Sequence, residues 1–190
     1  MNRLSIIFAG FLFTFATAWL GLAILPAQHY KVIANPADMA IERGRGIYVQ
    51  NGCLYCHSQQ ISARNFRSDQ DRGWGNRRTV ASDYRNDKMG LFGTMRTGPD
   101  LANIGERQTS EQWHYLHLYN PQITSKGSVM PPFRFLFDRR KMGGTPSPGA
   151  YALGDGDEIV PKAEARMLVA YLLSLKHDVG TPPEAFEPEK

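Results

Sequence analysis

The pattern of apolar and polar residues divides the chain into an uncharged N-terminal segment and a longer, mostly polar remainder. No charged residue occurs between Leu4 and Leu25, and about 20 apolar residues are enough for a helix to cross a bilayer. Large apolar side chains surround the expected helix, so it has no polar face with which to lie along a membrane surface. We predict a transmembrane anchor within residues 1–29, with its helix ended by Pro26.

A cleaved signal peptide is the alternative interpretation of this segment. The apolar part of a signal peptide is shorter, about 7–15 residues, and a small-x-small cleavage site follows it. Leu25-Pro26-Ala27 is a poor site of that kind, so we expect the anchor to be retained. Arg3 precedes the apolar segment, and positive residues tend to stay on the cytoplasmic side. The rest of the chain is therefore expected on the periplasmic side of a bacterial inner membrane.

Three later segments carry the start and stop signals of helices. Asn35-Pro36 is a cap followed by a first-turn proline, and it predicts a helix that runs to about Gln50. A capping box at 109–112 opens a second helix, which Pro121 ends. An apolar stripe near the C-terminus predicts a final helix, opened by Pro161. The fold class is therefore mainly α.

Other stretches show neither helical nor strand periodicity. Residues 62–95 hold seven basic and four acidic residues, and we predict a long, irregular but ordered insertion there, because loops of this length are usually functional. Residues 137–160 are rich in glycine and proline and are predicted to form a surface loop. Residues 181–190 are predicted to be a disordered tail. The domain after the anchor then spans residues 30–180.

Composition and charge limit the possible partners. The chain has 190 residues, of which 42% are hydrophobic, enough for one compact domain and an anchor. The formal net charge is only +4 and no long basic run occurs, so nucleic acid is not an expected partner. A mild positive excess suits a protein that docks other proteins through charge.

The two cysteines suggest the chemistry of the domain. Cys53 and Cys56 are followed at once by His57, which is the attachment signature of haem c. A disulfide, a redox dithiol or half of a zinc site are the alternatives. A zinc site needs four ligands, and His114 and His117 leave a Cys₂His₂ site conceivable. Otherwise these two histidines are expected to be structural. One covalently attached haem c is the prediction.

The ligand on the other face of the iron decides what such a haem does. A methionine thioether favours electron transfer, whereas an open position favours gas chemistry. Met130 is the candidate, because Pro131 and Pro132 stiffen the chain after it. By position alone it can also be a core filler. The loop alternatives are Met89, Met95 and Met142.

Other residues are candidates for the surroundings of the haem. An axial histidine usually donates its second ring N–H to a carbonyl or carboxylate, and Pro99 can present such a carbonyl. Arg96 and Arg107 can neutralise haem propionates or can lie in solvent. Tyr48 and Trp113 are core aromatics by default.

Several motifs resemble the monohaem subunit (subunit II, the FixO/CcoO family) of cbb3-type cytochrome c oxidase. The resemblance covers about residues 15–136. The motifs that carry it are Gly44…Tyr48…Gly52-Cys53-Leu54-Tyr55-Cys56-His57-Ser58-Gln59, Arg96-Thr97-Gly98-Pro99-Asp100-Leu101, Trp113-His114 with His117-Leu118, Asn120-Pro121 and Ser128-Val129-Met130-Pro131.

The resemblance implies a class I cytochrome c-like domain behind a single N-terminal transmembrane helix. It also implies a role for individual residues: His57 and Met130 as axial ligands, Cys53 and Cys56 as thioethers, and Pro99 as acceptor of the ring N–H. The helix that bears Gly44 and Tyr48 is expected to cross the terminal helix, because glycine permits a close approach.

The function implied is the relay of single electrons to the haem-copper catalytic subunit of a respiratory terminal oxidase. The electrons are expected from another c-type cytochrome, and membrane lipid is expected to hold the anchor. Such a subunit is not catalytic on its own. Three alternatives stay open: the cytochrome c subunit of a nitric oxide reductase-type complex, a haem-based gas sensor, and an assembly subunit whose haem is incidental.

Overall fold

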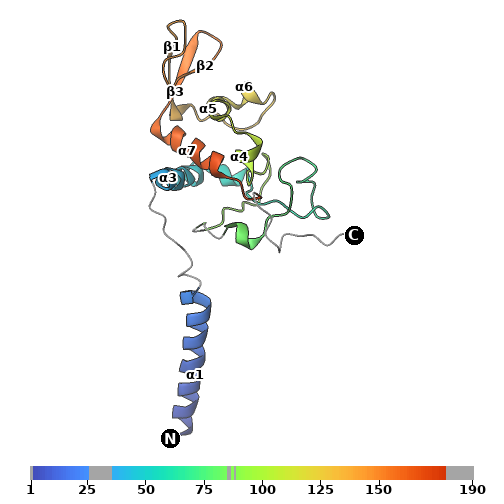
Figure 1. Ribbon diagram of the computed structural model, residues 1–190, viewed down its shortest axis with the longest axis vertical. Coiled ribbons are helices and arrows are strands. Elements are labelled where there is room, and N and C mark those ends of the chain that lie inside the picture. Colours follow the sequence, from blue (N-terminus) through green and yellow to red (C-terminus); the bar gives the residue numbers. More distant parts are fainter. Residues whose placement is uncertain (1, 26–35, 85–86, 88, 179–190) are drawn as a thin grey trace. The chain divides into compact units, whose positions relative to one another are not determined.

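The computed structural model describes residues 2–25, 36–84, 87 and 89–178 (Figure 1). The chain forms two compact units, residues Met1–Ile33 with Arg85–Lys88, and residues Ala34–Tyr84 with Met89–Lys190. Each unit is described by itself. Pro26, the segment before the second helix and the predicted tail at 181–190 lie outside the described residues.

The first unit is built on one apolar helix. Helix α1 (Arg3–Trp19) continues into a π-helical turn η1 (Leu20–Ile24). Together they form 22 residues with a mean hydropathy of 2.0, long and apolar enough to cross a membrane. Thr14 and Thr17 direct their hydroxyls back to carbonyls of the preceding turn, so these polar side chains are satisfied within the helix. The predicted apolar helix is confirmed.

The second unit is mainly helical. The helices are α3 (Pro36–Gln50), α4 (Ile104–Arg107), α5 (Glu111–Tyr119), α6 (Pro121–Thr124) and α7 (Ala163–Ser174), with 3₁₀ turns η2 (Cys53–Tyr55), η3 (Ala81–Tyr84) and η4 (Arg134–Leu136). Helix α3 has the bounds that its capping residues predict. At α5 the cap is Ser110, whose hydroxyl accepts from the amide of Trp113 at 3.2 Å. Pro121 follows α5 and opens α6.

Helices α3 and α7 cross at a glycine. A Cβ on Gly44 would lie 2.0 Å from the carbonyl oxygen of Met167, so no other residue permits this approach without a backbone shift. One turn further along α3, the ring of Tyr48 meets the edge of Tyr171 at a centroid distance of 5.5 Å. The close crossing expected from the resemblance is confirmed.

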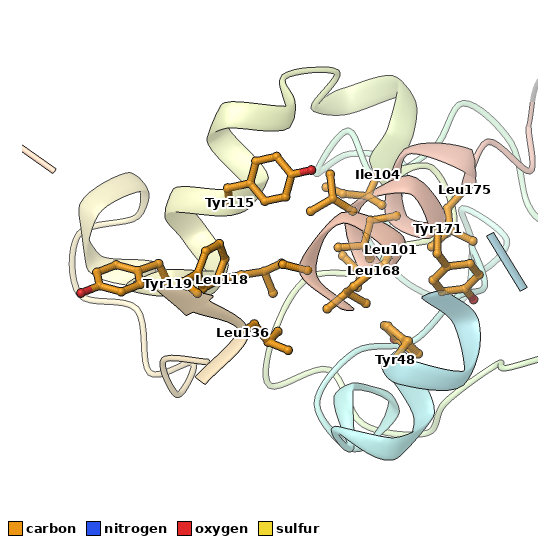
Figure 2. Packing of buried hydrophobic residues seen from close by; sticks show 14 of the residues in the cluster. Tyr48, Leu101, Ile104, Tyr115, Leu118, Tyr119, Leu136, Leu168, Tyr171 and Leu175 are labelled. Atoms are coloured by element: carbon orange, nitrogen blue, oxygen red, sulfur yellow. The ribbon is translucent and has the colours of Figure 1, made fainter. Parts of the chain in front are cut away.

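The core lies where α5 and α7 meet the segment around α4 (Figure 2). Leu168, Tyr171 and Leu172 of α7 are buried among Leu101 and Ile104 of the α4 segment. Each fully buried leucine stabilises the fold by about 1.5–3 kcal/mol relative to an exposed one. The core thus rests on the apolar stripe that the sequence shows near its C-terminus.

The segment predicted as a loop at 137–160 forms a sheet instead. Strands β1 (Phe137–Lys141), β2 (Tyr151–Ala152) and β3 (Asp157–Pro161) are antiparallel, in the order β1-β3-β2. Pro161 therefore ends β3 rather than opening α7. The strands escaped sequence analysis because β3 buries consecutive residues, including Glu158, and so has no alternating pattern.

Hydrogen bonds compensate the burial of Glu158 in this sheet. Its carboxylate accepts from the amide and hydroxyl of Ser147, both at 2.7 Å, and from Nε of Arg140 at 2.6 Å. These bonds lower the pKa of Glu158 to about 2. A buried carboxylate is tolerated only with such partners, so the sheet depends on pairings between residues distant in sequence.

The insertion at 62–95 is irregular but held by specific contacts. Within its described part the structure has turns and the single 3₁₀ turn η3. Arg77 donates to both carboxylate oxygens of Asp83, at 2.7 and 2.8 Å, and to the carbonyl of His177 at 3.0 Å. The amide of Asn76 donates to Asp178 at 2.7 Å. The insertion is thereby fastened to the chain that follows α7.

Candidate functional site

One cavity of about 660 Å³ in the second unit gathers the candidate residues. Its apolar lining includes Leu101, Ile104, Leu118, Leu168 and Leu172. The predicted site residues that line it are Tyr48, Cys53, Cys56, His57, Pro99, Trp113 and Met130. Of the predicted set, Arg96 is not part of the lining. Sequence positions from 48 to 172 thus meet at one site.

The end of α3 presents the two cysteines. Gly52 has φ +71°, a left-handed conformation that glycine adopts without cost and that ends the helix. The 3₁₀ turn η2 follows, and the amide of His57 closes it by donating to the carbonyl of Cys53 at 3.0 Å. The two cysteines are not joined to each other by a disulfide, and Cys56 is exposed and Cys53 half-buried. Burial raises the pKa of the Cys53 thiol to about 11.

A backbone carbonyl fixes the proton and the orientation of the His57 ring. Nδ1 of His57 lies 2.8 Å from the carbonyl oxygen of Pro99. Because a carbonyl only accepts, Nδ1 carries the hydrogen and Nε2 keeps its lone pair. Burial also lowers the pKa of His57, so the ring is neutral at pH 7. A neutral imidazole with an unprotonated Nε2 is the form that binds a metal.

Glycine lets this carbonyl reach the ring. A Cβ on Gly98 would lie 2.2 Å from Cε1 of His57, and the amide of Gly98 donates to the carbonyl of Cys56 at 2.9 Å. The backbone before Pro99 therefore lies directly against the imidazole. Any larger residue at Gly98 would displace either the ring or the Pro99 carbonyl.

A buried polar network lies behind the segments that contain His57 and Pro99. Asp100 is fully buried and accepts from the hydroxyl of Ser58 at 2.5 Å and from the amides of Gln60 and Ala102 at 2.8 Å. Burial raises the pKa of Asp100. These bonds join the segment after His57 to the segment after Pro99 and hold both in place.

Arg96 belongs to that network and does not face the cavity. Its guanidinium forms an ion pair with Asp69 and donates to the hydroxyl of Ser58 at 2.8 Å and to the carbonyl of Gln60 at 2.6 Å. The side chain is 12% exposed and that of Asp69 3%. The side chain is therefore not in solvent. Arg96 instead fastens the insertion to the backbone beside His57.

Arg107, the second arginine that the sequence offers as a propionate partner, does line the cavity. It lines the cavity with Thr97, Gln108 and Lys126 and donates to the carbonyl of Asp100. Burial lowers the pKa of its guanidinium. Sequence analysis missed Thr97, Gln108 and Lys126, because none has a spacing that distinguishes it from a surface residue. Together these groups give the cavity a polar, cationic edge.

Met130 is half-buried and lines the same cavity. Its amide donates to the hydroxyl of Ser128 at 3.2 Å, and the amide of Phe133 donates to the carbonyl of Leu118 at 2.8 Å. The second bond attaches the chain after Pro131 to α5. The loop alternatives Met89, Met95 and Met142 do not line the cavity. Of the four candidate methionines, Met130 is therefore the one that lines the cavity with His57.

Helix α5 completes the site with an aromatic cluster. The ring of Trp113 stacks on that of His117, with centroids 4.6 Å apart and planes at 8°, and meets His114 edge-on at 5.3 Å. Nε2 of His114 lies 2.8 Å from the carbonyl oxygen of Gln108, and Nδ1 of His117 lies 2.6 Å from the hydroxyl of Thr124. Both histidines are thus partnered, as expected of structural residues, and both also line the cavity.

The geometry suits a haem better than a zinc ion. Across the described residues, no three His, Cys, Asp or Glu side chains converge on a point that could hold a metal ion, whereas a structural zinc site needs four ligands. A haem needs two thiols at its edge, a neutral imidazole, a thioether and an apolar cavity. The lining supplies each of these, so the residues fit the group.

A comparison with known families decides the relationship. Residues 21–146 match the family described as cytochrome c oxidase, mono-haem subunit/FixO. The chain belongs to the FixO family. The matched range includes the two cysteines, His57, Pro99 and Met130, and it ends before strands β2 and β3. A search of curated proteins gives no match.

The FixO family gives the cavity its context. A FixO chain is a mono-haem cytochrome c subunit of a cytochrome c oxidase. The family therefore implies haem c as the cofactor and a partnership with the oxidase catalytic subunit. Together with the apolar helix Arg3–Ile24, it indicates a membrane-anchored protein.

Proposed function

We propose that this FixO chain relays single electrons to the haem-copper catalytic subunit of its oxidase through one covalently attached haem c. The observation that carries the proposal is the cavity shared by His57, held by Pro99, and Met130. An imidazole and a thioether that close both faces of an iron leave no position for a gas or substrate. That ligand pair suits electron transfer.

The chain's own residues hold and orient the group. Cys53 and Cys56 would hold the haem through thioethers, and His57 and Met130 would bind its iron. Pro99 keeps the proton of His57 on Nδ1, so Nε2 would be available to the iron. The haem supplies one-electron redox chemistry when bound. The apolar lining keeps water out, and Arg107 and Lys126 provide positive charge at the polar edge.

The anchor and the partners complete the proposal. The helix Arg3–Ile24 is retained in a bacterial inner membrane, surrounded by lipid, with the haem domain on the periplasmic side. This confines the haem near the catalytic subunit and so raises its effective concentration. Another c-type cytochrome supplies the electrons. The match to an oxidase subunit family favours this complex over a nitric oxide reductase.

The basic insertion is proposed as a docking face for an acidic partner. Arg64, Arg67 and Arg72 are exposed, whereas Arg77 is occupied by Asp83. Charges of this kind act mainly on the rate of encounter, and salt screens them. The rate of reduction by the donor cytochrome should therefore fall as salt rises. A rate that does not change with salt would remove the docking role and leave the relay itself intact.

The spectrum of the purified full-length protein tests the relay. In the oxidised protein we expect the near-infrared charge-transfer band of sulfur bound to iron, and in the reduced protein no immediate change on adding carbon monoxide. Alanine at Met130 should remove the band, whereas alanine at Met142, which lies away from the cavity, should keep it. Rapid carbon monoxide binding by the unaltered protein would instead support a haem-based gas sensor.

Turnover of the assembled oxidase tests the remaining alternative. A His57→Ala variant that assembles should lose electron delivery from the donor cytochrome, because the haem no longer has its histidine ligand. If such a complex reduced oxygen at the full rate with that donor, the subunit would be structural and its haem incidental.

A further inference from the structure

The two histidines of α5 face the same cavity with different nitrogens available. Nε2 of His114 donates to the carbonyl of Gln108, so this nitrogen carries a hydrogen and cannot bind a metal. His117 is oriented the other way. We assign the hydroxyl hydrogen of Thr124 to the carbonyl of Pro121, which lies 3.2 Å away, so that the hydroxyl oxygen accepts the Nδ1 hydrogen of His117.

This bond leaves Nε2 of His117 with a lone pair. Among the described residues the structure gives that nitrogen no hydrogen-bond partner, while the ring lines the cavity. The same arrangement of a fixed Nδ1 and an unprotonated Nε2 exists at His57, where Pro99 is the acceptor. A hydrogen-bonded Nδ1 is what typically prepares an imidazole to bind a metal through its second nitrogen.

The surroundings of His117 hold its ring and keep it neutral. Trp113 stacks on it in a nearly parallel plane, so the imidazole has little freedom to turn. Burial, and next the neighbouring His57, lower the pKa of His117 to about 4.

His117 lies next to the loop that carries Met130. The carbonyl of Leu118, the next residue, accepts from the amide of Phe133, which fastens the chain just after Met130 to this turn of α5. The hydroxyl of Thr124 attaches the other end of the same loop to His117 itself. His117 therefore stands between the two ends of the loop that carries Met130.

We propose that His117 is a reserve axial ligand, which binds the haem iron through Nε2 when Met130 leaves it. The inference rests on the proposed function, in which His57 and Met130 hold the iron. In the exchange an iron–sulfur bond breaks and an iron–nitrogen bond forms, and no proton or electron moves. Because a thioether raises the potential, the two-histidine form has a lower potential and slows electron relay, yet it still excludes gases.

Removing Met130 tests the proposal in the purified full-length protein. The Met130→Ala variant should lose the sulfur band but keep the low-spin spectrum of a six-coordinate haem, and it should still not bind carbon monoxide rapidly. Adding His117→Gln should convert it to a high-spin form that binds carbon monoxide at once. Adding His114→Gln instead should leave it low-spin, which makes His114 the matched control.

Thr124 tests how His117 is prepared. In the Met130→Ala background, Thr124→Val removes the acceptor of the Nδ1 hydrogen and should increase the high-spin fraction, whereas Thr124→Ser keeps the hydroxyl and should not. Two results would overturn the inference: a Met130→Ala protein that is already high-spin, or a Met130→Ala/His117→Gln protein that stays low-spin. If the unaltered protein lacks the sulfur band, the proposed ligand set fails first, and the two failures are distinguishable.

Discussion

The two walls of the cavity are built in different ways. The His57 wall consists of residues 57–60 and 93–102, which are joined across about forty sequence positions. The bonds from Ser58 and Gln60 to Asp100 bridge 42 and 40 positions, and the amide of Leu101 donates to the carbonyl of Ser58 at 2.8 Å. Much of this network is buried, so it opens only when a large part of the domain opens.

The Met130 wall, residues 125–133, is fastened mainly to itself. Counted within the described residues, the hydrogen bonds of residues 125–130 join positions at most six apart, such as the bond from Gln122 to the carbonyl of Ser128. Val129 is 80% exposed. The connection to α5 through Phe133 lies at the end of the wall.

The contrast shows which side of the site can change. Segments with few buried contacts and exposed hydrogen bonds open locally at low free energy, whereas buried networks open with the global unfolding. The Met130 wall is therefore the side where a ligand can leave, and the His57 wall keeps the haem in place. A reserve ligand is useful only beside the Met130 wall, and His117 is attached to both ends of the loop that carries Met130.

The largest expected effect is the loss of Arg96. An Arg96→Ala variant leaves the carboxylate of Asp69 buried without its cation, and breaking a buried pair in this way costs about 3–5 kcal/mol. Chemical unfolding of the full-length protein in detergent measures the change. The control is Arg64→Ala, whose partner Asp71 is 60% exposed and whose loss should cost at most about 1 kcal/mol. Equal effects for the two variants would contradict a buried network behind His57.

Glycine substitutions compare the two walls directly. In Gly98→Ala the new Cβ meets the His57 ring, and forced packing of this kind costs about 1–3 kcal/mol. It should also disturb the spectrum, since the imidazole or its Pro99 acceptor must move. In Gly127→Ala the Cβ meets nothing within 4 Å but φ is +81°, a backbone cost of about 1–2 kcal/mol. A Gly98→Ala protein with an unchanged spectrum would show that the ring has room to spare.

The difference between the walls also explains what the sequence could reveal. Helix α3 and the turn with Cys53, Cys56 and His57 follow from local signals, because caps, glycines and the attachment signature act within a few residues. Asp69 and Arg96 are 27 positions apart, and no periodicity relates them. The sequence therefore indicates only a propionate partner or a surface residue at Arg96, and its ion pair with Asp69 of the insertion is seen only in the structure.

The sheet at 137–161 was missed for the same physical reason. A strand is recognised from alternation when one face is buried and the other is in water. Strand β3 buries Asp157, Glu158 and Ile159 in succession. Partners distant in sequence make this burial tolerable: Arg139 and Lys141 for Asp157, and Arg140 and Ser147 for Glu158. Glycine and proline between the strands predicted a loop, and loops do occupy those positions.

Acid should weaken the network behind the His57 wall by protonating Asp69, the ion-pair partner of Arg96. Burial raises the pKa of this carboxyl, but the bonds from Arg96 and from the amide of Ser62 outweigh it and hold the pKa below the usual 3.8. A carboxyl with a depressed pKa contributes stability that is present above its unfolded pKa and is lost as the pH falls through its folded value. The melting temperature of Asp69→Asn should therefore lie below that of the unaltered protein at pH 7.

The difference between these two melting temperatures should begin to shrink as the pH falls below about 4, where the unfolded protein takes up a proton, and should vanish below the lower folded pKa of Asp69, where both proteins lack the charge. Asp83, whose pKa is also lowered, is present in both proteins and cancels in the difference. A difference that stays constant down to pH 2 would show that the charge of Asp69 is not what the network uses.

The smallest effect is expected at Ser128. Its hydroxyl accepts the amide of Met130 at 3.2 Å in a partly exposed loop, so Ser128→Ala should lower the global free energy of unfolding by no more than about 1 kcal/mol. Hydrogen exchange should nevertheless speed up for the amides of 126–130, because this bond helps to close the loop, and should stay unchanged for the amides of 58–61. Under the same conditions the low-potential, two-histidine fraction should rise slightly. If the amides of both walls exchanged faster together, the Met130 wall would not open by itself, and the physical basis for a ligand exchange on that side would be gone.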